Sequence, residues 1–198
     1  MSRHHLREQP SLFPDADRHL LDGAMGRVTS TPDFIDAATA AALFDLLREQ
    51  VPWRADRRVM YDRELDVPRL HASAAIDSPR LPPELHALAA RLVRETGTPF
   101  THIGFNFYRD ERDSVAPHND RLGDLVPGHP IVLLSLGATR RMTIRAKKPP
   151  RNVVHVDLVA GSLLSMDYET QLHYDHGIPK QAALCGPRIS LAFRVRTA

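Results

Sequence analysis

The feature that most restricts the fold of this chain is a period-two alternation of side chains in its second half. In segment 188–196 one face is apolar and consists of Ile189, Leu191, Phe193 and Val195. The other face carries Arg188, Ser190, Ala192, Arg194 and Arg196. Successive side chains of a strand point to opposite faces, so an extended strand separates these two sets. The segment therefore predicts a strand whose apolar face packs into a core.

Shorter segments typical of strands precede it at 102–108, 131–136, 142–145, 153–158 and 162–167, separated by turns rich in glycine, proline and charge. Upstream, apolar residues at helical spacing predict a helix over 36–50, which Pro52 ends. A second helix is expected to begin near Pro82–Pro83 and to end at Gly97. Two helices followed by many short strands predict an α+β domain, and a double-sheet jelly roll braced by the helices is the natural architecture.

Length and composition predict a single soluble domain over residues 1–198. Hydrophobic residues make up 42%, which is enough for a core, and residues 1–31 are expected to form an irregular N-terminal arm. No apolar run approaches the roughly 20 residues of a membrane span, and the first residues lack the apolar stretch of a signal peptide. The lone Cys185 excludes an internal disulfide. We expect a monomer in the reducing cytoplasm, and the net charge of +2 does not by itself indicate nucleic acid.

A pattern suited to a catalytic iron site occurs three times. His-x-Asp places two metal ligands on one side of an extended segment, and a distant histidine completes the two-histidine, one-carboxylate set of Fe(II) oxygenases. The matches are His118-Asn119-Asp120, His155-Val156-Asp157 and His173-Tyr174-Asp175. Any one of them alone is more often an ordinary surface or hydrogen-bonding pair. The first is favoured because a strand with Asn106 and Tyr108 precedes it, and His176 in a Gly- and Pro-containing turn is the expected third ligand.

The two arginines of the last strand permit an argument from size. Arg188 and Arg194 lie six positions apart and share a face, with Cα atoms about 20 Å apart at ~3.3 Å per residue. Each side chain reaches roughly 7 Å, which leaves a gap of about 6 Å. That gap suits the carboxylates of a five-carbon diacid, which arginine binds bidentately. A solvated basic face is the alternative, and an upstream metal site favours the diacid.

The motifs of the chain, in their order and spacing, resemble those of the AlkB family of Fe(II)/2-oxoglutarate dioxygenases. The resemblance runs from about Val67 to the C-terminus, roughly two thirds of the chain. The motifs are Asn106-Phe107-Tyr108-Arg109-Asp110, Asp113-Ser114-Val115, His118-x-Asp120, Ser135-Leu136-Gly137-Ala138, Gly161-Ser162-Leu163-Leu164, His176-Gly177-Ile178-Pro179-Lys180 and the run from Arg188 to Arg194.

The resemblance implies a double-stranded β-helix, a jelly-roll variant, with a catalytic core over 100–198 and a substrate lid over 50–80. It implies iron ligands at His118, Asp120 and His176, and a 2-oxoglutarate site formed by Asn106, Tyr108, Arg188, Ser190 and Arg194. With Fe(II), 2-oxoglutarate and O2, family members hydroxylate an alkyl group on a base nitrogen. The products are succinate, carbon dioxide, an aldehyde and the free base.

Base recognition is where the chain departs from the family pattern. Many relatives carry an acid two positions after the metal-binding Asp, where this chain has Leu122, with Asp124 the nearest acid. Relatives also often place an aromatic residue shortly after the Pro-Arg of the lid. Here the segment 70–74 after Pro68-Arg69 contains His71 but no phenylalanine, tyrosine or tryptophan. Trp53 and Tyr61 are other stacking candidates, and each of the three is more often a core or solvated residue.

Basic residues that suit phosphates gather in two places. The first cluster is Arg54, Arg57, Arg58, Arg63 and Arg69, where interleaved acids also fit a solvated face. The second cluster includes Arg140, Arg141 and Lys147, and no acidic residue occurs between Arg140 and Arg151. It predicts a hairpin that contacts a nucleic-acid backbone.

Two other functions compete with dealkylation of DNA or RNA. The first is a 2-oxoglutarate oxygenase that hydroxylates a protein side chain or a small molecule, which Leu122 and the missing aromatic favour. The second is a non-enzymatic binding module, which the complete ligand set and both arginines oppose.

Overall fold

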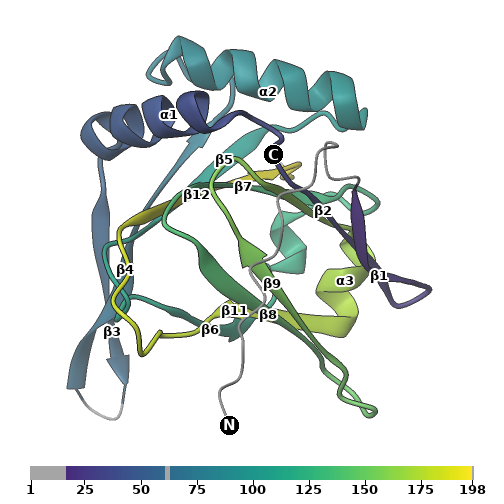
Figure 1. Cartoon of the computed structure of the whole chain (residues 1–198). Helices are drawn as coiled ribbons and strands as arrows, with labels where there is room; N and C mark the ends of the chain where they lie inside the picture. The colour runs from purple at the N-terminus through teal and green to yellow at the C-terminus, as the bar shows by residue number, and fades with distance from the viewer. Residues whose placement is uncertain (1–16, 61–62, 198) are drawn as a thin grey trace, which may run out of the picture.

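Two antiparallel sheets packed face to face form the body of the domain in a computed structural model (Figure 1). The structure describes the backbone of residues 17–60 and 63–197. It describes their side chains as well, except for those within 56–66. In spatial order, the 8-stranded sheet contains β1 (Arg18–Gly23), β2 (Gly26–Thr31), β10 (Leu163–Met166), β7 (Ile131–Gly137), β12 (Arg188–Arg194), β5 (His102–Tyr108), β4 (Arg63–Ala75) and β3 (Arg54–Met60). The 4-stranded sheet contains β6 (Val115–His118), β11 (Tyr174–Ile178), β8 (Arg140–Ala146) and β9 (Val153–Leu158). This is the jelly roll predicted from the sequence.

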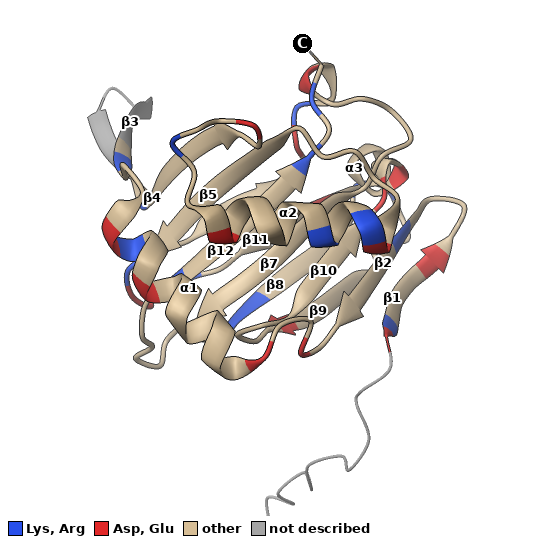
Figure 2. Cartoon of the chain, turned by 90° about the horizontal axis from the view of Figure 1, so that it is seen from above, with Lys and Arg blue, Asp and Glu red and all other residues tan. Residues whose placement is uncertain are grey.

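Two helices cover the outer face of the larger sheet, where Figures 1 and 2 show them side by side. They are α1 (Ala37–Gln50) and α2 (Pro83–Thr96), as the sequence predicts. Asp36 caps the first by accepting from the backbone N–H of Thr39, and Gly97 ends the second in the left-handed conformation with φ 67°. Both helices brace the sheet from outside and leave its inner face to the smaller sheet.

The alternation in β12 divides the interior into two layers. Leu191 and Phe193 are fully buried in the layer beneath α1 and α2. The alternate residues face the smaller sheet, and there Arg188 and Ser190 are buried as well. A strand with two buried faces and arginine on one of them needs an ionic partner in the interior, which locates the candidate site between the sheets.

The N-terminal prediction is wrong where the structure describes it. Residues 18–31 form the hairpin of β1 and β2 and extend the larger sheet through the pairing of β2 with β10. Residues 1–16 lie outside the described part of the chain. The β-branched residues of 28–31 suit a strand, and Gly26 supplies the turn with φ 148°.

The region predicted as a lid also contributes strands. β3 and β4 pair with each other, and β4 pairs with β5 from Leu70 to Ala75. A short helix, α3 (Tyr168–His173), and a 3-10 turn, η1 (Leu122–Asp124), complete the elements and were not anticipated. Among the described residues no helix is both long and apolar enough to cross a membrane.

Candidate functional site

The three residues predicted to bind a metal come together at the end of the smaller sheet. β6 and β11 pair in a register that places His118 opposite His176, with ring centroids 4.6 Å apart. Asp120 follows in the loop after β6. One ligand atom from each of the three lies within 4.8 Å of the others. The described residues contain no second group of this kind, so neither His155-x-Asp157 nor His173-x-Asp175 gathers a third ligand.

The environment of these side chains favours the protonation states that metal ligands require. Burial, with His118 adding to it, lowers the pKa of His176 to about 4 and keeps that imidazole neutral. Burial raises the pKa of Asp120, but the charge and hydrogen bond of Arg194 and the two imidazoles outweigh it, so the pKa lies below its ordinary value. The Nδ1 of His118 contacts the Ala116 carbonyl at 2.9 Å, which leaves Nε2 for a metal.

This donor set fits Fe(II). Two imidazoles and one carboxylate leave coordination positions for a co-substrate and oxygen. The buried Nδ1 of His176 has no hydrogen-bond partner among the described residues, so no hydrogen bond at this nitrogen sets the direction of the ring. A metal bound by His176, His118 and Asp120 would fix its orientation.

Arg194 connects the metal candidates to the larger sheet. Its Nε donates to Asp120 Oδ2 at 2.6 Å, and the two side chains are 22% and 13% exposed. Gly104 on β5 makes this contact possible, since a Cβ there would lie 2.9 Å from Arg194 Nη1. The contact leaves one carboxylate oxygen of Asp120 for a metal.

The predicted 2-oxoglutarate residues share the inner face of two neighbouring strands. The register of β5 and β12 pairs Tyr108 with Arg188 and Asn106 with Ser190. A cavity of about 40 Å³ reaches from this face to the metal candidates. Its lining includes Arg69, Asn106, Tyr108, His118, His176, Ser190 and Arg194.

Arg188 lies at the far end of this face as a buried cation with few partners. It is fully buried, and its Nη2 donates to Ser135 Oγ at 2.9 Å, while Nε and Nη1 have no hydrogen-bond partner in the part of the chain that the structure describes. Its guanidinium lies 5.4 Å from the Tyr108 ring centroid. Burial lowers its pKa to about 10 and raises the pKa of the Tyr108 hydroxyl. A carboxylate would accept from N–H groups of this guanidinium that Ser135 leaves without a partner, so the geometry fits one end of a diacid.

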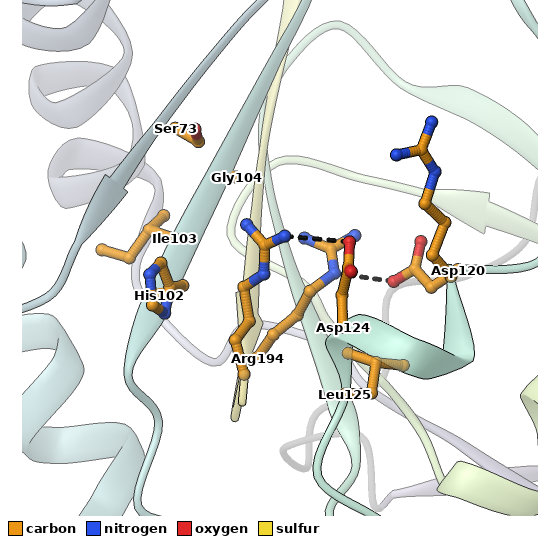
Figure 3. A pocket seen from close by; sticks show the side chains of 10 residues that line it. Ser73, His102, Ile103, Gly104, Asp120, Asp124, Leu125 and Arg194 are labelled. Carbon is orange, nitrogen blue, oxygen red and sulfur yellow. Dashed lines mark hydrogen bonds and ion pairs between the residues drawn. The ribbon is translucent and has the colours of Figure 1, made fainter. Parts of the chain in front are cut away.

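A second, larger cavity of about 270 Å³ has both members of the Arg194–Asp120 pair in its lining (Figure 3). Asp124 lies at this cavity and pairs with Arg196 at 3.0 Å. Small side chains leave it open, since Ser73 and Gly104 both line it. The predicted substrate residue Asp124 therefore borders space next to a metal candidate, while the nearby Leu122 is half-buried and absent from the lining.

The other stacking candidates differ in position. His71 is half-buried on β4, opposite Asn106, and so lies on the strand face that carries the site. Trp53 packs on Phe107 with ring centroids 5.2 Å apart, on the face beneath the helices, so it is a core residue and not a stacking platform. Tyr61 lies outside the described residues.

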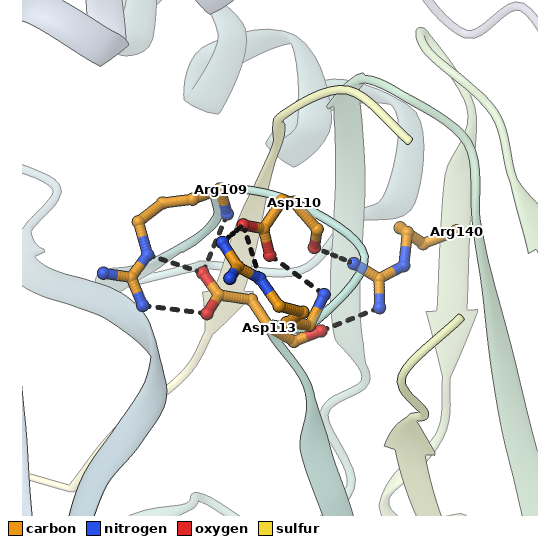
Figure 4. A network of polar contacts seen from close by, with 5 residues as sticks. Arg109, Asp110, Asp113 and Arg140 are labelled. Carbon is orange, nitrogen blue, oxygen red and sulfur yellow. Dashed lines mark hydrogen bonds and ion pairs between the residues drawn. The ribbon is translucent and has the colours of Figure 1, made fainter. Parts of the chain in front are cut away.

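The predicted basic hairpin is largely engaged in internal contacts. Arg140 is 1% exposed and donates to the carbonyls of Asp110 and Asp113 (Figure 4). It also donates to the Pro179 carbonyl. It therefore does not contact phosphates, and that prediction is wrong because the residue points inward. Arg141 is exposed and pairs with Asp157 through two hydrogen bonds across β8 and β9.

Sequence reasoning missed Ser135 and Gln171. Ser135 is the hydrogen-bond partner of Arg188. The motif that begins at Ser135 resembles the family, but no role was expected for this side chain. Gln171 is fully buried on α3, and its Oε1 accepts from the backbone N–H of Asp120 at 3.1 Å. The sequence gives little indication of a buried role for Gln171, because the largely polar segment 167–171 is typical of a turn. The side chains of Arg57, Arg58 and Arg63 are outside the described set, and Arg69 donates to Asn106 Oδ1 at 2.8 Å.

Known proteins with similar sequences agree with this geometry. Residues 27–194 match the family model described as the 2OG-Fe(II) oxygenase superfamily. The chain is 32% identical over 189 residues to the alpha-ketoglutarate-dependent dioxygenase alkB homolog 3 of Mus musculus, which covers 86% of this chain and 66% of that protein. It is 36% identical over 119 residues to the DNA oxidative demethylase ALKBH2 of Mus musculus, covering 57% of this chain and 50% of that protein.

The chain thus spans just under two thirds of the length of the first relative, at 66%, and 50% of the second. A solved structure, that of OsALKBH1, superposes with a TM-score of 0.60 at 15% identity. The superposition covers 91% of this chain and 100% of that chain, which is a likeness of fold.

Proposed function

The chain belongs to the 2OG-Fe(II) oxygenase superfamily and is AlkB-like, and on this premise we propose that it dealkylates bases of nucleic acid oxidatively. Such enzymes use Fe(II), 2-oxoglutarate and O2. The observation that carries the proposal is the joint presence of two features on one inner face. One is the compact set of His118, Asp120 and His176, and the other is the buried, under-satisfied Arg188.

In this proposal His118, Asp120 and His176 hold iron, which when bound supplies the oxidising chemistry on O2. Arg194 fixes one oxygen of Asp120 and directs the other toward the metal. Burial of His176 keeps its lone pair available near neutral pH. The chain thus supplies an ionised carboxylate at Asp120 and a neutral imidazole at His176.

The proposed 2-oxoglutarate site uses the same strand face. Arg188 and the Tyr108 hydroxyl bind the carboxylate far from the metal, and Arg194 lies at the near end. Asn106, oriented by Arg69, and Ser190 line the space between them. The apolar layer between the larger sheet and the helices α1 and α2 covers the outer face of this sheet and excludes water there.

The substrate part of the proposal rests on the names of the relatives and on the 270 Å³ cavity beside Asp120. One oxygen atom of O2 enters succinate as 2-oxoglutarate loses carbon dioxide, and the other enters the alkyl C–H bond. The hydroxylated alkyl group then leaves the base nitrogen as an aldehyde, and a proton replaces it. His71, Asp124 and Arg141 are proposed contacts to the nucleic acid, which the chain binds as a monomer in the cytoplasm.

The test measures succinate from 2-oxoglutarate with N-methylated oligonucleotides and with the same strands unmodified. The proposal expects Fe(II)-dependent succinate that the methylated strands stimulate, and loss of it in His118→Ala and Asp120→Ala. Stimulation by a peptide or metabolite in place of every alkylated strand would favour hydroxylation of a protein or small molecule. Leu122 supports that rival, since it offers no acceptor for an exocyclic amine.

A further inference from the structure

A buried glutamine outside the proposed ligand set holds the backbone of one ligand. Gln171 is fully buried, and its Oε1 accepts from the Asp120 N–H at 3.1 Å, across 51 positions of sequence. Its Nε2 is buried and has no partner among the described residues. A buried amide nitrogen without a partner costs free energy, so the contribution of this side chain lies in the bond that its Oε1 makes to Asp120.

The helix that carries Gln171 is fixed at its N-terminal end. The carboxylate of Asp167 caps α3 by accepting from the Thr170 N–H at 2.8 Å. The N–H of Asp167 donates to the Arg27 carbonyl at 3.0 Å, and the Arg27 N–H donates to Asp167 Oδ2 at 2.8 Å, so this cap joins the helix to β2. A helix of only six residues gains little stability from its own hydrogen bonds, so these external contacts set its position.

Lys147 fixes the other end of the same helix. Its ammonium donates to the carbonyls of Gln171 at 2.8 Å and Leu172 at 3.2 Å, and its backbone N–H donates to the His173 carbonyl at 2.9 Å. A cation at a helix C-terminus satisfies carbonyls that have no partner within the helix. The neighbouring Lys148 is exposed and makes no hydrogen bond or ion pair within the described part of the chain.

From these contacts we propose that Gln171 is a positioning residue for the metal ligand Asp120, and that Lys147 acts through it by fixing α3. Asp120 is then held from two directions, its carboxylate by Arg194 and its backbone by Gln171. This inference rests on the proposed metal site and assigns Lys147 to that site in place of a phosphate contact. Partners of metal ligands of this kind typically change metal affinity by about 10- to 100-fold.

The experiment measures Mn(II) affinity of the full chain by titration calorimetry without 2-oxoglutarate. Gln171→Met keeps the volume and removes the acceptor, and Leu172→Ala on the exposed side of the same helix is the matched control. Gln171→Met is expected to weaken Mn(II) binding about 10-fold or more, while Leu172→Ala binds as the wild type does. Equal affinities of the two variants would overturn the inference. Failure of the wild type itself to bind Mn(II) would instead overturn the proposed metal site.

Lys147→Met and Lys148→Met separate the two roles of the hairpin. Lys147→Met should weaken Mn(II) binding severalfold and leave the salt dependence of oligonucleotide binding at the wild-type slope, whereas Lys148→Met should leave Mn(II) affinity unchanged. Because both residues act through one helix, Lys147→Met combined with Gln171→Met should weaken binding less than the product of the single effects. A Lys147→Met variant with normal Mn(II) affinity and a shallower salt slope would show a phosphate contact and refute the assignment.

Discussion

Replacing Arg188 with methionine should raise the stability of the protein without 2-oxoglutarate and nearly abolish binding of 2-oxoglutarate. Arg188 is fully buried, and two of its nitrogens, Nε and Nη1, have no hydrogen-bond partner among the described residues. At neutral pH the guanidinium is charged in both the folded and the unfolded state. Burial disfavours the charged form in the folded state only, which is why its pKa falls to about 10.

The magnitude follows from these contacts. The fall in the Arg188 pKa amounts to about 3 kcal/mol, and the lost hydrogen bond to Ser135 offsets about 1 kcal/mol of it. A net gain of about 2 kcal/mol would raise the Tm by roughly 4–8 °C for a chain of this size. Two charge-assisted hydrogen bonds to a carboxylate are worth about 1.5–3 kcal/mol each, so 2-oxoglutarate affinity should fall roughly 100-fold or more.

The assays are thermal unfolding without ligand and calorimetric titration with 2-oxoglutarate in the presence of Mn(II) under anaerobic conditions. Arg141→Met is the matched control, because Arg141 is exposed and pairs with Asp157 on the outer surface. It should change stability by less than about 1 kcal/mol and leave 2-oxoglutarate affinity unchanged. An Arg188→Met protein that is less stable than the wild type, or that binds 2-oxoglutarate normally, would refute the reasoning.

Three further predictions concern residues around the site. Gly104→Val should fold and raise the Kd for 2-oxoglutarate at least about 10-fold, since its Cβ would lie 2.9 Å from Arg194 Nη1 and displace it; calorimetry showing wild-type affinity would contradict this. Arg140→Met should cost about 3–5 kcal/mol in urea unfolding because three carbonyls in buried or partly buried hydrogen bonds lose their donor, and a loss under 1 kcal/mol would show that they find other partners. Mn(II) at 100 times the wild-type Kd should stabilise the wild type by about 2.7 kcal/mol in a thermal scan. A similar gain in His176→Ala at the same Mn(II) concentration would exclude His176 as a ligand.

The sequence predicted the elements whose pattern is local. The strict alternation of 188–196 predicts β12, and the arginines on one of its faces already indicate an interior ligand. Pro83 and Gly97 mark the ends of α2 by their own backbone preferences. These patterns depend only on neighbouring residues and not on contacts with distant segments. The sequence alone therefore predicts the elements that they define.

What the sequence missed depends on pairing between distant segments. β4 contains Pro68, which argues against a strand, yet Pro68 lies where the register with β3 shifts, between the pairs of Asp66 and Leu70. Arg140 and Arg141 look alike in sequence, but alternation along β8 turns the first inward and the second outward. The acid that neutralises Arg141 lies on the next strand, so a count of charges along the chain overstated the basic surface.

We expect this chain to couple oxidation of 2-oxoglutarate to removal of an alkyl group from a base. Intact-mass analysis of an N-methylated oligonucleotide tests this coupling, after incubation with the protein, Fe(II), 2-oxoglutarate and O2 and with succinate quantified in the same sample. The strand should reach the mass of the unmodified oligonucleotide, with one succinate formed per methyl group lost, and Asp120→Ala should leave its mass unchanged. Vigorous succinate formation by the wild type with the methylated strand left intact would contradict it.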